Sequence, residues 1–136
     1  MASRPKQEVA VGPADRFAAG RFTMLDIQGH DIGVVRLRDG SLRAVRNHCP
    51  HKGAPICRGI VAGTWLPSAP GSLVYDREGE VLACPWHGWE YDLDTGMELF
   101  RDVPTRLRFY PVAVRDGQVY VTVRVNAPAE TEETVP

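Results

Sequence analysis

The chain has 136 residues, 43% hydrophobic and 24% charged, a composition typical of one soluble globular domain and not of a disordered chain. Its net charge of −1 gives no general argument for binding nucleic acid or an anionic membrane. The sequence has no run approaching about 18 apolar residues and no apolar signal segment near its start, so we expect a cytoplasmic protein without a membrane span.

Both ends of the chain are expected to be tails around one domain. The last eleven residues, 126–136, are acidic, contain proline and lack aromatic residues, and the first eight likewise contain proline and lack aromatic residues. We therefore expect a flexible tail over 1–8, a single domain over 9–125 and a second flexible tail over 126–136. Within the domain, Pro13 to Gly20 is long enough for one helical turn, and no longer helix is indicated.

Between the tails, strand-forming residues alternate with short turn sequences that contain glycine, which are hairpin signals. Four hairpins at short spacing favour an all-β sandwich or barrel-like domain. The expected hairpins cover residues 31–45, 73–84, 90–100 and 110–123, with turns at Asp39-Gly40, Glu78-Gly79, Asp94-Thr95-Gly96 and Asp116-Gly117.

Two loops each place a cysteine and a histidine close together. Cys49-Pro50-His51-Lys52-Gly53 follows the expected strand 42–45, and Cys84-Pro85-Trp86-His87-Gly88 follows the expected strand 81–83. The glycine after each histidine permits the positive φ that a tight loop needs. Brought together at one end of a β domain, these loops would present four ligands to a common point: Cys49, His51, Cys84 and His87.

Two metal chemistries fit two cysteines and two histidines. One is a tetrahedral zinc ion. The other is a [2Fe–2S] centre in which two cysteines bind one iron and two histidines bind the other. Each loop here mixes cysteine with histidine, which suits a binuclear cluster held from two sides better than a zinc finger that pairs like with like. A closed disulfide framework is not favoured, because the chain has three cysteines.

The paired motif C-x-H and C-x-x-H, with the flanking HGW, resembles the Rieske iron–sulfur domain of bacterial ferredoxins and ring-hydroxylating oxygenases. The resemblance covers about Val34 to Val123. It implies antiparallel sheets with a small cluster-binding subdomain, about residues 46–92, and one [2Fe–2S] cluster. It also implies that Cys49 and Cys84 bind one iron, and that His51 and His87 bind the other, solvent-facing iron.

One feature departs from the family pattern. Thirty-two residues separate His51 from Cys84, more than is usual in the family, and the extra length lies near residues 61–73. We expect this segment to be a surface loop.

The resemblance implies an electron carrier and not an enzyme. A terminal oxygenase also needs a mononuclear iron site with two further histidines and a carboxylate, and His30 and His48 form no such paired motif. There is no G-x-G-x-x-G nucleotide fingerprint either. We expect a soluble, monomeric ferredoxin that passes electrons from a flavin-dependent reductase to a terminal oxygenase. The alternatives are a permanently bound Rieske subunit, similar to the small subunit of nitrite reductases, and a zinc-stabilised β module that mediates protein contacts.

Neighbouring residues suggest a reduction potential in the lower half of the Rieske range. Quinol-oxidising Rieske proteins brace their two loops with a disulfide and place a serine after the second HG. The positions of the two disulfide cysteines are Ala54 and Trp86 in this chain, and the position of the serine is Trp89. The chain therefore lacks both the disulfide and the serine hydroxyl. Tyr91 matches a tyrosine that can donate to a cysteine sulfur, with an ordinary strand aromatic as the alternative.

Other residues near the loops have simpler interpretations. Cys57 is expected to be a small buried residue, and His48 a surface loop residue. Arg46, Lys52 and Arg58 make the first loop basic, a candidate docking patch for an acidic partner.

Overall fold

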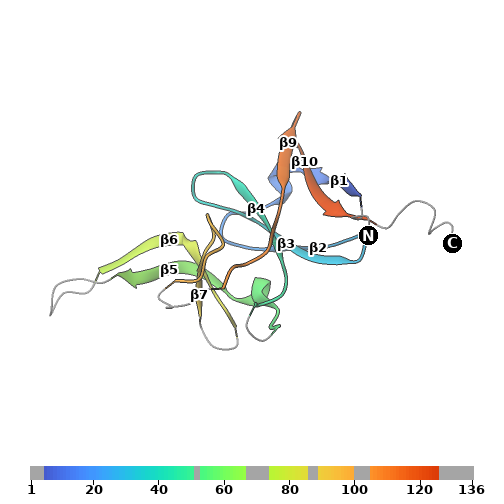
Figure 1. Ribbon diagram of the computed structural model, residues 1–136. Coiled ribbons are helices and arrows are strands. Elements are labelled where there is room, and N and C mark those ends of the chain that lie inside the picture. The colour runs from blue at the N-terminus through green and yellow to red at the C-terminus, as the bar shows by residue number, and fades with distance from the viewer. Residues whose placement is uncertain (1–4, 51–52, 67–73, 86–88, 100–104, 126–136) are drawn as a thin grey trace.

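The computed structural model describes residues 5–50, 53–66, 74–85, 89–99 and 105–125. Their regular structure consists of three antiparallel sheets and two single turns of 3₁₀-helix, which confirms the predicted all-β fold (Figure 1). No helix among these residues is long and apolar enough to cross a membrane.

The first sheet has the strand order β1-β10-β9, the second β2-β3-β4-β8 and the third β5-β6-β7. The strands are β1 (Lys6–Pro13), β2 (Thr23–Ile27), β3 (His30–Arg36), β4 (Leu42–Arg46), β5 (Ile60–Leu66), β6 (Val74–Ala83), β7 (Glu90–Asp92), β8 (Phe109–Tyr110), β9 (Val112–Arg115) and β10 (Gln118–Arg124); the 3₁₀ turns are η1 (Ala14–Arg16) and η2 (Ile56–Arg58).

The second sheet lies at the centre because two of its strands, β3 and β4, bury side chains on both faces. On β3, Ile32 and Val34 join one buried cluster together with Val119 and Val121 of β10. Val35, on the opposite face of the same strand, belongs to a second buried cluster that contains all three cysteines. Side chains of a strand alternate between its two faces. One face of β3 therefore packs against the first sheet, and the other packs against the region predicted to bind the [2Fe–2S] cluster.

Three of the four predicted turns are confirmed. The hairpin β3–β4 closes around Gly40, β9–β10 closes at Asp116-Gly117 with positive φ at both residues, and the chain after β7 reverses through residues 93–96. The expected helical turn after Pro13 is η1.

The predicted turn at Glu78-Gly79 is wrong, since both residues lie inside the continuous strand β6. Ala62 of β5 pairs with Val81, and Thr64 pairs with Asp76, so residues 77–80 bulge opposite the single residue Gly63. Gly79 has a φ of +82°, which the bulge needs as much as a turn would. A Glu-Gly sequence indicates a positive φ at the glycine, but it does not distinguish a β-bulge from a hairpin turn.

The extra residues between the two cysteine loops are not all loop. Residues 61–66 belong to β5, which pairs with β6 in a two-stranded ribbon that extends away from β1, β9 and β10 in Figure 1. Residues 67–73 lie outside the described residues, as do residues 126–136. At the other end of the chain, residues 6–8 pair with β10. The predicted flexible tail over residues 1–8 is therefore wrong for residues 6–8, which belong to β1.

Candidate metal centre

Each of the two predicted ligand loops begins just after a strand and is closed in the same way. The Cys49 N–H, three residues after β4, donates a hydrogen bond to the Ala54 carbonyl at 2.8 Å. The Cys84 N–H, directly after β6, donates to the Trp89 carbonyl at 2.8 Å. Each bond joins a cysteine to the residue five positions later. The two cysteines therefore start equivalent tight loops, even though their histidines stand at different positions within them.

The first loop needs its glycine. Gly53 has a φ of +77°, and its N–H donates to the Cys49 carbonyl at 2.9 Å. A β-carbon at this position would lie 3.1 Å from the His48 ring. The role predicted for this glycine is confirmed.

Both cysteine thiols are buried in the same cluster. Cys49 is 1% exposed and Cys84 is 4% exposed, and both pack with Leu82, Leu93 and Tyr91. All three cysteines of the chain are described, and none is in a disulfide. The described residues contain no group of three or more metal-ligating side chains. Two of the four predicted ligands, His51 and His87, lie outside them, so their assignment stays a prediction; Lys52 and Trp86 lie outside them too.

Tyr91 lies directly against one of these thiols. Its hydroxyl oxygen is 3.5 Å from the Cys49 Sγ, and its side chain is fully buried. Burial raises the pKa of the Tyr91 hydroxyl, and the hydrogen bond with Cys49 raises it further. The hydroxyl therefore keeps its proton at neutral pH and can donate it to a thiolate.

Cys57 is not arranged as a ligand. It is buried, and its thiol donates to the Val45 carbonyl at 3.8 Å. Burial raises the pKa of Cys57 to about 12, so the thiol stays protonated at neutral pH. A β-carbon at Gly33 would lie 2.6 Å from its sulfur, so the two residues are closely packed. The prediction that Cys57 is a small buried residue is confirmed.

Asn47 was not singled out from the sequence, yet it connects three segments near the centre. Its Oδ1 accepts a hydrogen bond from the Cys57 N–H at 2.9 Å, and its Nδ2 donates to Asp31 at 3.1 Å. Asn47 thus fixes the chain that leaves β4 against β3 and η2, two residues before Cys49. An asparagine directly after a strand is a weak signal, because such residues are common in turns of every kind.

The buried donors fit a soft metal centre. Two thiols enter one apolar cluster from separate loops, and a tyrosine hydroxyl faces one of them. Thiolates are the ligands preferred by iron–sulfur clusters and zinc. A hydroxyl that hydrogen-bonds a ligand sulfur is an outer-shell contact through which a protein adjusts a redox centre.

Comparison with known proteins identifies similar sequences and folds. The Rieske [2Fe–2S] domain family matches residues 7–111. The 3-phenylpropionate/cinnamic acid dioxygenase ferredoxin subunit of Photorhabdus laumondii is 32% identical over 85 residues, which cover 62% of this chain and 67% of that protein. The chain spans about a quarter of the length of several other curated relatives, which are longer monooxygenase chains.

Two solved structures are similar over nearly their whole length. The ferredoxin of carbazole 1,9a-dioxygenase from Nocardioides aromaticivorans superposes with a TM-score of 0.64 at 25% identity, covering 89% of this chain and 99% of that one. A Mycobacterium tuberculosis protein described as an NADH-dependent nitrite reductase small subunit gives a TM-score of 0.64 at 27% identity, covering 90% and 99%.

Proposed function

We propose, since this chain belongs to the Rieske [2Fe–2S] domain family, that it carries single electrons from a flavin-dependent reductase to a terminal oxygenase. When bound, a Rieske cluster supplies a one-electron centre with a potential of roughly −150 to +300 mV. The chain's own residues hold and tune that centre. The observation that carries the proposal is the pair of buried cysteines, Cys49 and Cys84, at the start of two equivalently closed loops.

We assign the four ligands as the sequence pattern predicts them. Cys49 and Cys84 hold the inner iron, and His51 and His87 hold the outer one. The burial of both thiols supports the first half of this assignment, because water is excluded from the sulfur side. The histidine side would be the exit for electrons. The resemblance to a dioxygenase ferredoxin subunit supports the choice of an oxygenase as the recipient.

The reduction potential tests the function and its tuning together. We predict a one-electron midpoint potential in the lower half of the Rieske range, and below about +100 mV. Ala54 brings no thiol for a disulfide brace, and Trp89 brings no hydroxyl where quinol-oxidising relatives have serine. Potentiometric titration followed by visible circular dichroism measures it. A midpoint potential well above +100 mV would contradict the prediction and would mean that other hydrogen-bond donors replace the missing disulfide and serine hydroxyl.

Replacement of Tyr91 by phenylalanine should lower this potential. The Tyr91 hydroxyl faces the Cys49 sulfur at 3.5 Å, and its hydrogen bond is stronger when the sulfur carries more negative charge, that is, after reduction. A preference of about 1 kcal/mol for the reduced state corresponds to roughly 40 mV for one electron. The same titration on the variant measures the shift. An unchanged or higher potential would exclude a tuning role for the hydroxyl, provided that the iron content is unchanged.

The second candidate is a Rieske subunit held permanently in a larger oxidoreductase. The extensive structural similarity to the protein described as a nitrite reductase small subunit favours it. Purification of the native protein from its source separates the two candidates. A stoichiometric large subunit that co-purifies through gel filtration would support the bound subunit, and an isolated, reducible protein would support the carrier.

A further inference from the structure

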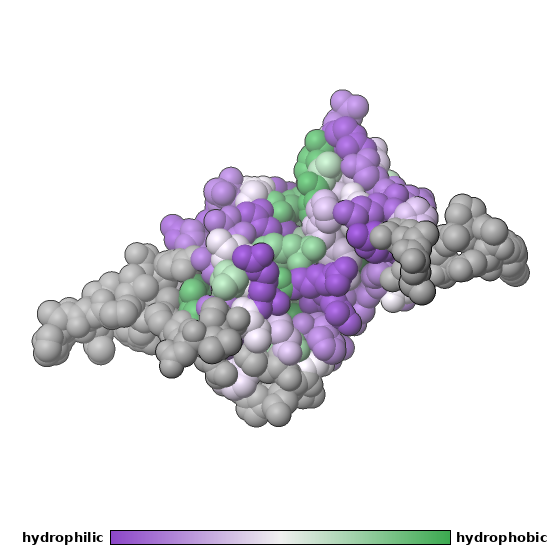
Figure 2. All heavy atoms as spheres, viewed as in Figure 1, coloured by the Kyte–Doolittle hydropathy of each residue, from purple (hydrophilic) through white to green (hydrophobic). Residues whose placement is uncertain are grey.

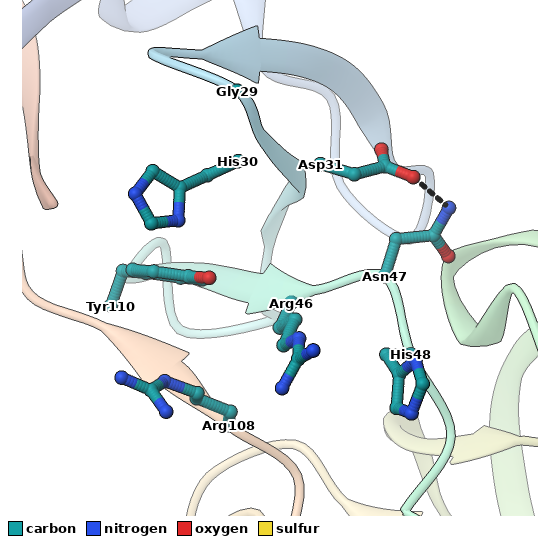
Figure 3. Close-up of a pocket in the computed structure, with 8 residues that line it drawn as sticks. All are labelled: Gly29, His30, Asp31, Arg46, Asn47, His48, Arg108 and Tyr110. Carbon is teal, nitrogen blue, oxygen red and sulfur yellow. Dashed lines mark hydrogen bonds between the residues drawn. The ribbon is translucent and has the colours of Figure 1, made fainter. Parts of the chain in front are cut away.

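A hollow beside the first ligand loop is lined by two arginines, Arg46 and Arg108, and by residues from three separate parts of the chain. It has a volume of about 440 Å³. Figure 3 shows Arg46 between Arg108 and His48, and Tyr110 between His30 and Arg108. The residues come from the β2–β3 turn, the end of β4 and the chain that enters β8. His48 directly precedes Cys49, so this hollow borders the proposed metal centre.

The two arginines occupy opposite positions on paired strands. Val45 pairs with Phe109, and the Arg46 N–H donates to the Arg108 carbonyl at 2.9 Å, so Arg46 and Arg108 are directly opposite. Like charges in this arrangement destabilise a sheet. Neither guanidinium group forms a hydrogen bond or ion pair with another residue of the described part of the chain. Among the described residues, therefore, no carboxylate forms an ion pair with either guanidinium.

The remaining lining residues include one carboxylate against the two arginines, so the hollow keeps a net positive charge. His30 is held in place by its Nε2, which donates to the Arg124 carbonyl at 2.7 Å, and its ring packs edge-on against Tyr110. Asp31 accepts from Asn47 and is the single carboxylate among the described residues of this hollow. A neighbouring hollow shares His30, Arg108 and Tyr110 and adds two cations, Lys6 and Arg124. The cationic surface is thus continuous across both.

We infer that this cationic hollow, defined by Arg46 and Arg108 and lined also by His30 and His48, is the docking site for carboxylate side chains on the acidic surface of a protein redox partner. The inference rests on the proposed function, because an electron carrier needs to bring its partner close to its centre. Planar guanidinium groups match carboxylates with two parallel hydrogen bonds. Most of the described surface visible in Figure 2 is hydrophilic, which suits a transient contact guided by charge.

The cationic hollow differs in its residues from the docking patch predicted from the sequence. That patch combined Arg46 with Lys52 and Arg58, which are close in the sequence. The hollow joins Arg46 with Arg108, 62 positions later, and does not include Arg58. Lys52 lies outside the described residues.

Stopped-flow oxidation of the dithionite-reduced protein tests the inference with two oxidants of opposite charge, ferricyanide and tris(1,10-phenanthroline)cobalt(III). Each takes one electron from the protein and is reduced to its divalent metal form. The double variant Arg46→Gln/Arg108→Gln should react about tenfold more slowly with ferricyanide at low ionic strength. Its reaction with the cobalt complex should be unchanged or faster. The difference should shrink at about 1 M salt, where charges are screened within about 3 Å.

Arg115→Gln is the control for loss of a positive charge outside the hollow. Arg115 is an exposed arginine on β9, paired with Glu8 in the first sheet, and it does not line the hollow. Its ferricyanide rate should stay within about twofold of the wild-type rate. Equal slowing by the control and the double variant, or no slowing by the double variant, would overturn the docking site.

A hexaglutamate peptide serves as the stand-in for an acidic protein segment. It should compete with ferricyanide and slow the wild-type reaction but not that of the double variant. If inorganic phosphate competes at the same concentration as the peptide, the hollow is a site for small anions and the inference is wrong. A protein with no reducible cluster would instead refute the proposed function, so the two failures are distinguishable.

Discussion

Replacement of Cys84 by serine should abolish the metal centre. Cys84 is 4% exposed, and its loop is closed by the bond from its N–H to Trp89. A serine alcohol does not supply the thiolate that the cluster needs, so we expect iron and acid-labile sulfide to fall below about a tenth of the wild-type content. Metal analysis and visible absorbance measure the loss. His87→Ala should have the same effect if the sequence-based assignment is correct.

Cys57→Ser is the matched control for this loss. Cys57 lies in the same buried cluster as Cys49 and Cys84, but its thiol faces the Val45 carbonyl and its pKa is raised to about 12 by burial. The variant should retain its iron and its colour. Far-ultraviolet circular dichroism on all three proteins separates loss of a ligand from loss of the fold. A colourless Cys57→Ser protein with a native spectrum would show that the ligands are wrongly assigned.

Replacement of Gly59 by alanine should strongly destabilise the domain. A β-carbon on Gly59 would lie 1.9 Å from the Ala83 carbonyl oxygen and 3.1 Å from the Ile56 carbonyl oxygen. Both obstacles are backbone atoms, so β6 would have to move away from η2. Overpacking of this severity costs about 3 kcal/mol, at the upper end of its usual range. For a domain of this size, that lowers the melting temperature by roughly 10 °C.

Gly20→Ala shows what a glycine substitution costs without a close contact. Gly20 has a φ of +71°, and a β-carbon there meets no atom within 4 Å. Its cost is the positive φ alone, about 1 kcal/mol. Thermal unfolding followed by circular dichroism compares the two variants. If Gly59→Ala melts as high as Gly20→Ala, the close approach of β6 to η2 is not as the structure places it.

The position of Gly59 also connects the fold to the centre. Ala83 is the last residue of β6 and pairs with Ile60 of β5, and Cys84 follows it directly. A displaced β6 would displace this cysteine. We therefore expect Gly59→Ala to reduce iron incorporation as well as stability.

Local signals predicted most of the hairpins and both ligand loops. Asp39-Gly40 and Asp116-Gly117 sit between strand-forming runs, and Cys-Pro followed by His and Gly marks each loop. These features lie within a few residues of one another, so the sequence displays them directly. Glu78-Gly79 was misassigned because a bulge and a turn both require the positive φ found at Gly79.

Features that depend on distant segments could not be predicted. β1 begins with three exposed polar residues, Lys6, Gln7 and Glu8, and their pairing with β10, more than 100 positions later, makes them part of a strand. β2 was missed similarly, because its turn of Gln28 and Gly29 lacks a strong hairpin sequence. The same reason hid the juxtaposition of Arg46 and Arg108, which arises from the pairing of β4 with β8.

The central claim is that this chain holds a [2Fe–2S] cluster with mixed cysteine and histidine ligands. Electron paramagnetic resonance before and after dithionite reduction tests it most directly, with iron, sulfide and zinc quantified on the same sample. We predict a silent oxidised protein that becomes a rhombic S = ½ species on reduction, with an average g below that of four-cysteine ferredoxins. Absence of a signal, with about one zinc per chain and failed iron reconstitution, would contradict the claim and assign the protein to the zinc-stabilised class.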